Sequence, residues 1–258
     1  MNRSVLLSFD VEEFDMPLEY NFPISANEQM EVGKRGLDTI DSILCDPSIQ
    51  STLFTTANFA MQYPESIKLH AQKHEIASHT FYHSNFKEED LKLSKNKLEE
   101  ICGKPITGLR MPRMRKVSMQ EVTKAGYLYD SSINPTWLPG RYNNLHLPRT
   151  VYSDEKILRI PASVSPFFRI PLFWLSFKNL PYGIFKMLAL QTLYTDGYLC
   201  LYFHPWEFTS IENYGLPGFT KKLNGEPLIQ KLKRLINDLK KEADFISMNS
   251  FINTRNPV

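Results

Sequence analysis

Short apolar runs alternate with amphipathic segments along almost the whole chain. Each run is short enough for a buried strand, and turn residues separate it from the next segment. The alternation predicts an α/β fold built on a mainly parallel sheet. The expected strands are residues 4–9, 51–57, 74–79, 106–110, 127–133, 156–161, 198–204 and 244–248.

Apolar residues recur with helical spacing in two segments between those strands. Residues 33–46 and residues 228–239 each place leucine or isoleucine side chains on one helical face, which predicts helices that pack on the core. Ser118 and Glu121 match a capping box, and Gly126 is expected to end the short helix that follows them.

Length and composition fit one soluble domain. The chain has 258 residues, of which 42% are hydrophobic and 22% are charged, so a sizeable core can be buried. Barrel-type α/β folds of this size form a single unit, and we expect one domain over residues 1–258. Thirty basic and 28 acidic residues leave a net charge of +2, which is too balanced for a nucleic-acid binder. The oligomeric state stays open.

Three features favour a cytoplasmic protein. Cys45, Cys102 and Cys200 are odd in number and widely spaced, which predicts reduced, buried thiols. The apolar run before Asp10 has neither the length of a signal-peptide core nor a cleavage site. Prolines and charged residues interrupt the most hydrophobic segment, residues 165–194, so no run approaches the ~20 apolar residues of a membrane span.

Polar residues recur where the predicted strands end. Catalytic groups of parallel α/β folds gather at the carboxyl ends of the strands. The proline-containing stretch 134–150 is expected to form a long loop, and loops of this length in a compact domain often carry function. The residues at the strand ends are Asp10, Glu12, His79, Arg110 and His204, and Asp130 lies within the fifth predicted strand.

His79 and His83 stand four residues apart, a spacing that one helical turn converts into neighbouring side chains about 5 to 6 Å apart. Two neutral imidazoles at this spacing can bind one divalent ion, and a carboxylate completes a site with an open position for water. Asp10 and Glu12 offer that carboxylate, and both can point one way because Val11 separates them. A hydrogen-bonded or exposed histidine pair is the alternative.

Other charged residues near these motifs allow two interpretations each. Glu13 and Asp15 are expected to be solvated charges of a loop. His204 runs directly into Pro205, and a strand-end histidine is either a structural hydrogen-bonding residue or a general acid. Arg110 forms either a structural ion pair or a contact that orients a catalytic carboxylate.

The order and spacing of five motifs resemble the polysaccharide deacetylases of the NodB-homology type, carbohydrate esterase family 4. The motifs are "SFDVEEFD", "HTFYH", "RMPR", "YDSSINP" and "LYFHPWEF", and they span most of the chain. The resemblance implies a distorted (β/α) barrel with about seven strands, which uses a divalent metal to hydrolyse N-acyl groups, usually acetyl, of amino sugars. By position it assigns Asp10 as the base, His79 and His83 as metal ligands, Arg110 as the residue that steadies the base, His204 as the acid and Asp130 as the group that orients His204.

The first motif departs from the usual pattern of two adjacent acids. Val11 stands in the second position, so the resemblance passes the third ligand role to Glu12 and leaves Asp10 as the base, with the reverse assignment as the alternative. This arrangement resembles the subgroup that includes lipid-linked aminosugar deformylases and intracellular peptidoglycan-deacetylase-like proteins. Met114 replaces the glycine expected after the arginine motif, and Trp137 lies seven residues beyond Asp130. Zn is the expected metal, with Co or Mn as alternatives.

The substrate expected from these features is an N-acylated sugar that is nucleotide-linked or lipid-linked. For a lipid-linked substrate, residues 167–175 are a candidate contact with the inner membrane surface, and a buried layer under the barrel is the alternative. Trp137, Tyr142 and Trp206 either stack on sugar rings or pack inside the protein. Two other functions stay open, a non-catalytic glycan-binding barrel and a metal-independent hydrolase of cyclic amides.

Overall fold

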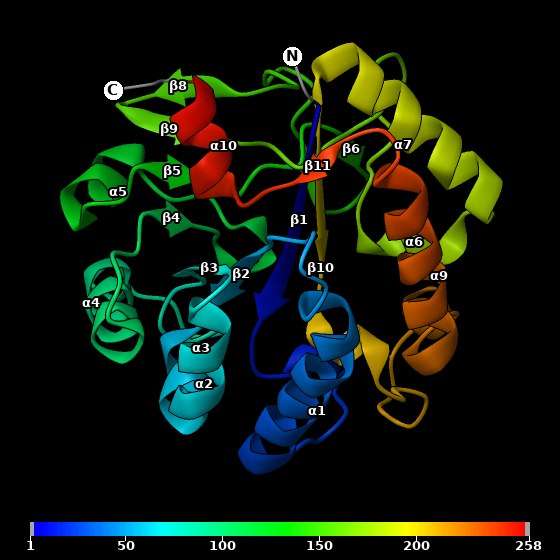
Figure 1. The fold of residues 1–258 in the computed structure, drawn as a ribbon. Helices are drawn as coiled ribbons and strands as arrows, with labels where there is room; N and C mark the ends of the chain where they lie inside the picture. Colours follow the sequence, from blue (N-terminus) through cyan, green and yellow to red (C-terminus); the bar gives the residue numbers. More distant parts are fainter. Residues whose placement is uncertain (1–2, 256–258) are drawn as a thin grey trace.

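The computed structural model describes residues 3–255 of the chain. Residues 1–2 and 256–258, which belong to the predicted domain 1–258, lie outside the described residues. A curled sheet forms the centre of the molecule, and helices surround it (Figure 1). Its strands are β1 (Ser4–Val11), β2 (Thr52–Thr55), β3 (Glu75–Ser78), β4 (Gly108–Leu109), β5 (Tyr129–Asp130), β8 (Tyr152–Asp154), β9 (Ile157–Arg159), β10 (Tyr198–Phe203) and β11 (Asp244–Phe245).

The sheet is parallel over most of its width. Within the described residues, seven strands run parallel in the order β10, β1, β2, β3, β4, β5, β9. Strand β8 pairs antiparallel with β9 at one edge, and β11 pairs with the start of β1. Every strand expected from the apolar runs overlaps an observed strand of this sheet, whereas β8 was not expected. The predicted α/β fold, a distorted barrel with about seven strands, is confirmed.

Helices follow most of the strands. The segments 33–46 and 228–239 lie largely within α1 and α9 as predicted, and α1 begins earlier because Ser25 Oγ accepts the Glu28 N–H at 3.2 Å. Gly126, with φ 90°, ends α5, but Ser118 makes no side-chain cap, so the predicted capping box is wrong. The helices are η1 (Met16–Tyr20), α1 (Ala26–Leu44), α2 (Ala57–Gln62), α3 (Pro64–Ala71), α4 (Asp90–Cys102), η2 (Pro112–Met114), α5 (Met119–Ala125), α6 (Trp174–Asn179), α7 (Tyr182–Asp196), η3 (Pro205–Phe208), α8 (Gly218–Lys221), α9 (Gly225–Leu239) and α10 (Met248–Arg255).

Strand β1 shows how the sheet divides two apolar layers. Its odd-numbered residues from Val5 to Val11 belong to the larger core cluster, in which the sheet packs with helices such as α1 and α9. Leu6 belongs to the smaller cluster, with Phe54 and Tyr129. Because side chains alternate along a strand, Ser8 and Asp10 continue the Leu6 face. The same alternation carries Val11 into the apolar core and away from the polar residues at the strand ends.

The three cysteines are free thiols in different surroundings. Cys200 is buried in the smaller cluster, as predicted, but Cys102 is only partly buried. Cys45 is exposed at the end of α1, so the prediction of a buried thiol is wrong there. In the described part of the chain, none of the helices combines the length and the apolar character required to cross a membrane.

Candidate metal centre and catalytic pocket

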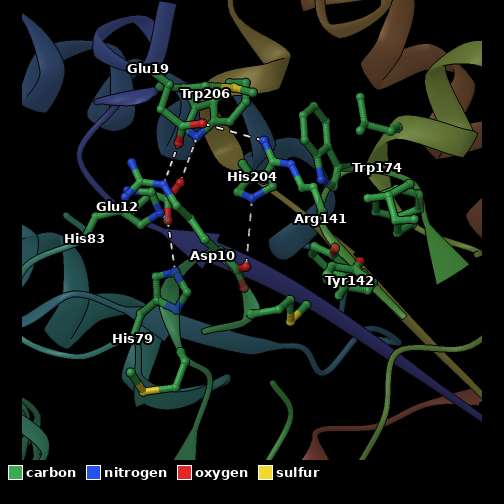
Figure 2. Close-up of a pocket in the computed structure, with 18 of the residues that line it drawn as sticks. Asp10, Glu12, Glu19, His79, His83, Arg141, Tyr142, Trp174, His204 and Trp206 are labelled. Carbon is green, nitrogen blue, oxygen red and sulfur yellow. Dashed lines mark hydrogen bonds and ion pairs between the residues drawn. The ribbon is translucent and has the colours of Figure 1, made fainter. Parts of the chain in front are cut away.

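Five of the predicted site residues line one cavity of about 270 Å³. Asp10 lies near the carboxyl end of β1, and Glu12 follows that strand. His79 and His204 directly follow β3 and β10, and His83 lies four residues beyond His79. Figure 2 shows that these side chains converge from different parts of the sheet. The parallel strands therefore bring together residues that are distant in sequence, as expected from their positions at strand ends.

Glu12 presents one carboxylate oxygen to the two histidines. Its Oε1 accepts a hydrogen bond of 3.1 Å from Trp206 Nε1, which fixes the carboxylate. Its Oε2 lies 2.9 Å from His79 Nε2 and 3.2 Å from His83 Nε2. Burial opposes ionisation of this carboxyl, but the His83 and His79 rings, when protonated, outweigh burial and hold the pKa of Glu12 well below its usual range.

The hydrogen bonds of the two rings set their tautomers. His79 Nδ1 lies 2.8 Å from the carbonyl oxygen of Arg110, and His83 Nδ1 lies 2.6 Å from Asp15 Oδ1. A carbonyl or carboxylate oxygen only accepts, so Nδ1 carries the proton in both rings. In the neutral rings Nε2 is left with a lone pair, and in both His79 and His83 that atom faces Glu12.

The segment between the two histidines is a loop and not a helical turn. Thr80 has φ 63°, a left-handed conformation, and its Oγ1 donates to the Tyr82 carbonyl oxygen at 3.0 Å. The helical geometry assumed from the four-residue spacing is therefore wrong. The rings still come together, with centroids 5.7 Å apart, because the loop folds back over the end of β3.

The three groups fit a divalent metal ion. One ligand atom from each of Glu12, His79 and His83 lies within 4.8 Å of the others, and all three residues are buried. Despite the two nearby nitrogens, Glu12 Oε2 receives no hydrogen bond. A buried carboxylate oxygen that faces two lone pairs is costly unless a cation or proton lies between them. One carboxylate and two imidazoles are ligands that Zn, Co and Mn accept.

Glu13 and Asp15 both form hydrogen bonds with His83, one of the three candidate metal ligands. The prediction that these two acids are solvated is wrong. Both side chains are buried. Glu13 accepts hydrogen bonds from Thr56 Oγ1 at 2.7 Å and from the His83 N–H at 3.2 Å. Burial raises the pKa of Asp15, but its hydrogen bond with His83 and the charge of that ring bring the pKa below its usual value. Carboxylates in this position orient metal-binding histidines.

Arg110 fixes Asp10 from inside the barrel. The guanidinium is completely buried, and its Nη1 donates to Asp10 Oδ1 at 2.7 Å and to Ser8 Oγ at 2.9 Å. Ser131 accepts further hydrogen bonds from it, and the Phe54 and Tyr202 rings lie against it. Burial alone lowers the pKa of an arginine, but Asp10 raises that of Arg110. Arg110 therefore forms an ion pair, and its partner is the candidate base Asp10.

His204 faces Asp10 from the opposite wall of the pocket. Its Nε2 lies 3.9 Å from Asp10 Oδ2 (Figure 2), and its Nδ1 lies 3.0 Å from Glu207 Oε1. Burial lowers the pKa of His204, but the hydrogen bond with Glu207 and the nearby carboxylates raise it above the usual value. Glu207 is itself paired with Lys178 Nζ at 3.0 Å, and both side chains are fully buried.

Glu207 and Lys178 are site residues that the sequence prediction missed. Glu207 stands three residues after His204, the spacing of a capping box across η3, and this was the available signal. Burial raises the pKa of Glu207, but Lys178 and His204 bring it below its usual value. Lys178 lies in α6, and no local feature of the sequence links it to the strand end that carries His204.

Asp130 does not contact His204. Its carboxylate accepts hydrogen bonds from Arg159 Nε at 2.9 Å and from the Ser132 N–H at 3.0 Å. Ser132 Oγ also donates to it. These partners tie β5 to β9, so the contacts of Asp130 are those of a structural residue, and Glu207 occupies the position expected for it beside His204.

Two glycines let α1 approach the backbone of the site. A Cβ atom at Gly33 would lie 2.4 Å from the Glu12 carbonyl oxygen. A Cβ atom at Gly36 would lie 2.3 Å from the Pro205 carbonyl carbon and oxygen. Real Cβ atoms do not approach this closely, so glycine is required at both positions. One helix thereby packs against the segments that carry Glu12 and His204.

The three aromatic residues proposed for sugar stacking lie in different surroundings. Trp206 is buried and stacks on His204, with ring centroids 4.9 Å apart. Tyr142 lines the cavity, whereas Trp137 is 61% exposed and does not line it. Within the predicted loop 134–150, β6 (Trp137–Leu138) and β7 (Tyr142–Asn143) form a short hairpin that forms one wall of the cavity.

This chain is similar to known proteins well beyond the residues of the site. Residues 3–129 match a family model described as polysaccharide deacetylase, and the search of curated proteins gave no match. A Mycobacterium smegmatis protein assigned as a polysaccharide deacetylase is 18% identical, with a TM-score of 0.66 over 97% of this chain and 90% of the other. A Pseudomonas aeruginosa protein of the same assignment is 15% identical, with a TM-score of 0.65 over 96% and 88%.

A third similar structure is Puue allantoinase, which is 16% identical, with a TM-score of 0.67 over 96% of this chain and 88% of the other. At these identities the structural likenesses establish a shared fold. The matched residues 3–129 include Asp10, Glu12 and the histidine pair. Residues 3–129 are thus similar to the polysaccharide deacetylase family, and this similarity supports a hydrolase that acts on carbon–nitrogen bonds.

Proposed function

We propose that the protein is a metal-dependent hydrolase that removes an N-acyl group, in the first place acetyl, from an amino sugar. The observation that carries this proposal is the set of atoms Glu12 Oε2, His79 Nε2 and His83 Nε2, which face one another in the cavity that also holds Asp10 and His204. A divalent ion held there, Zn first and Co or Mn as alternatives, supplies Lewis-acid polarisation of an acyl carbonyl and activation of water.

Asp10 is the base in this proposal. Arg110 holds Oδ1 of its carboxylate, and Oδ2 is turned toward His204. A carboxylate in this position accepts a proton from a water molecule as the water oxygen adds to the acyl carbon. The ion pair with the buried guanidinium keeps the carboxylate in one orientation, which reduces the entropy lost when the transition state forms.

His204 is the acid. Glu207 accepts the Nδ1 proton and raises the pKa of the ring, so that in the protonated ring Nε2 carries the second proton toward the cavity. As the carbon–nitrogen bond breaks, this proton passes from Nε2 to the leaving amine nitrogen. The products are a carboxylic acid and a free amino sugar, and the proton accepted by Asp10 restores the ring.

The substrate in this proposal is a nucleotide-linked or lipid-linked N-acyl sugar in the cytoplasm.

Residues 167–175, which were expected to contact a membrane, divide into two parts. Leu172, Phe173 and Trp174 are buried, and the latter two line the cavity, whereas Phe167 and Phe168 are 77% and 85% exposed. This aromatic pair is the candidate contact with the inner membrane surface. Flotation with anionic liposomes tests it, and protein that stays entirely in the soluble fraction contradicts the membrane contact.

The decisive experiment combines metal analysis with an assay of acetate release. We expect the purified protein to hold about one divalent ion per chain, and to release acetate from an N-acetylated amino sugar in the presence of Zn, Co or Mn. His79→Ala should lose both the ion and the activity. His70→Gln, which changes a histidine on α3 outside the cavity, is the matched control and should retain both.

The same experiment separates the two alternatives that the sequence left open. Folded protein that binds sugar but holds no metal and releases no acid would favour the non-catalytic glycan-binding barrel. Hydrolysis of a cyclic amide that persists in excess chelator would favour the metal-independent hydrolase. The likeness to an allantoinase carries the fold alone and does not favour the second alternative.

A further inference from the structure

A second cavity, of about 540 Å³, adjoins the catalytic pocket. Arg113, Met114, Arg141 and Tyr142 line both cavities, so the two share a wall. The second cavity lies between the segment that follows β4 and the loop and strands that follow β5. The metal centre and the acid lie wholly in the first cavity, so their chemistry does not account for the second.

The charged residues that line the second cavity are mainly cations. Its basic side chains outnumber its single carboxylate, although the whole chain carries a net charge of only +2. The positive charge is therefore concentrated here and is not a property of the surface in general. We call this cavity the basic cleft, and its charged lining residues are Arg113, Arg115, Lys116, Arg141, Arg159 and Asp154.

Some of these cations are already neutralised inside the protein. Arg159 pairs with Asp130 at 2.9 Å and with Asp154 at 2.8 Å. Arg113 likewise contacts both Glu19 and Asp15. These two arginines contribute little net charge to a ligand.

Three other cations remain available. In the part of the chain that the structure describes, Arg115 and Lys116 form no ion pair, and Arg115 has the Phe86 ring as its neighbour. Arg141 is half-exposed, and its nearest carboxylate oxygen, on Glu19, is 3.6 Å away. The basic cleft therefore offers two to three uncompensated positive charges, which match the charge of a phosphate or diphosphate.

The backbone that carries these cations is held in an unusual conformation. Arg113 and Met114, two consecutive non-glycine residues, have φ of 55° and 53°. Such left-handed residues cost free energy and persist where the surrounding structure fixes them, often at functional sites. Hydrogen bonds of 3.1 Å from the Met114 and Arg115 N–H groups to Met111 and Pro112 close the turn. The turn follows Arg110 directly. It therefore connects the arginine that holds the candidate base, Asp10, to the basic cleft.

We propose that the basic cleft binds a phosphate group of the substrate, so that the enzyme acts on an N-acylated amino sugar carried on a phosphate or diphosphate. This inference rests on the proposed function, because it places the sugar in the first cavity and its phosphate in the second. Arginine binds phosphate through paired N–H groups, and a neutral polysaccharide would leave these cations without a partner. A nucleotide and a lipid carrier share this phosphate chemistry.

Calorimetric titration with uridine diphosphate tests the binding without using activity. We expect the double variant Arg115→Ala/Lys116→Ala to bind at least 10-fold more weakly than the wild type. Lys34→Ala/Arg35→Ala removes the same two charges from α1 and should bind as the wild type does. The difference should persist in excess chelator. Equal binding by both double variants, or binding that chelator abolishes, overturns the inference.

Deacetylation assays then identify the source of the phosphate. The substrates are N-acetylglucosamine carried on uridine diphosphate and on a polyprenyl diphosphate. For these we expect Arg115→Ala/Lys116→Ala to have a KM at least 10-fold above the wild-type value, with a smaller change in kcat. The carrier that shows this effect is the substrate class. If no N-acetylated sugar is hydrolysed but the titration still depends on Arg115 and Lys116, the proposed function fails and the phosphate site stands. If neutral N-acetylated oligosaccharides are hydrolysed and the titration shows no binding, the phosphate site fails and the hydrolase stands.

Discussion

His83 and His204 occupy opposite walls of the catalytic pocket with nearly the same set of partners. Each donates its Nδ1 proton to a buried carboxylate, Asp15 at 2.6 Å for His83 and Glu207 at 3.0 Å for His204. Each also turns Nε2 toward a second carboxylate, on Glu12 at 3.2 Å and on Asp10 at 3.9 Å. The residue type and its immediate partner therefore do not decide which ring binds metal and which transfers a proton.

The difference lies in what else meets the second carboxylate. Glu12 is also contacted by His79, so three ligand atoms face one small space, and a cation there satisfies all of them. Asp10 is already paired with Arg110, and His204 Nε2 lies too far from its carboxylate for a direct hydrogen bond, so both groups stay available to a substrate. In this pocket, the role of a histidine is therefore set by the other groups that contact the carboxylate facing its Nε2 atom.

Removing the Glu207 charge should have the largest effect on this comparison. In Glu207→Gln we expect kcat to fall by about 10²-fold or more, because the protonated His204 loses its carboxylate partner. Since Glu207 raises the pKa of His204, the limb of the kcat profile in which activity falls with rising pH should move to lower pH. A purely structural role would lower kcat without moving that limb.

A second variant separates catalysis from folding. Glu207→Gln leaves Lys178 buried without a carboxylate, which costs about 3 to 5 kcal/mol of stability. Glu207→Gln/Lys178→Met removes both charges and should recover stability in a urea titration while kcat stays low. Recovery of kcat together with stability would mean that the pair serves folding alone.

Removing the charge of Asp15, the carboxylate partner of His83 on the other wall, should weaken metal binding. Asp15→Asn keeps a hydrogen-bond acceptor beside His83 but removes the charge, and we expect metal affinity to fall about 10- to 100-fold. At saturating metal, kcat should return to within a few-fold of the wild type. Competition with a chromophoric chelator measures the affinity. An unchanged metal affinity would mean that Asp15 does not support the centre.

The residues of the pocket were predictable where a strand positions them. The alternation along β1 places Asp10 on the inner face and Val11 in the apolar core, and strand ends gather His79, Arg110 and His204. These assignments need only the period of a strand and the parallel topology. The fold was predictable for the same reason.

The supporting residues were not predictable because distant segments supply their partners. Asp15 looks like a loop charge until His83, 68 residues away, reaches it. Lys178 appears only as an interruption of an apolar segment until α6 packs against η3. Asp130 shows the reverse error, since Arg159 from the next parallel strand takes the contact expected with His204. Local sequence shows a charge, but tertiary packing decides whether it is solvated or buried.

A third histidine, His74, tests the same rule with the smallest expected effect. Its Nδ1 accepts the Ser51 N–H at 3.2 Å and its Nε2 lies 3.1 Å from the Leu44 carbonyl oxygen, so the neutral ring satisfies both contacts without a carboxylate. Burial, followed by the charge of Lys73, lowers the pKa of His74 to about 4 from an unfolded value of 6.5. The ring therefore stabilises the fold fully above pH 6.5, and this contribution is lost as the pH falls toward 4.

His74→Gln cannot gain a proton, although its amide can accept from one backbone group and donate to the other. We expect urea titrations in excess chelator to give the wild type an additional loss of stability between pH 7 and pH 5, on the order of 1 kcal/mol relative to this variant. His146→Gln, at an exposed histidine, should retain the wild-type pH dependence. If His74→Gln and the wild type lose stability in parallel, the His74 ring is not held neutral in the folded protein, and the contrast with His83 and His204 fails.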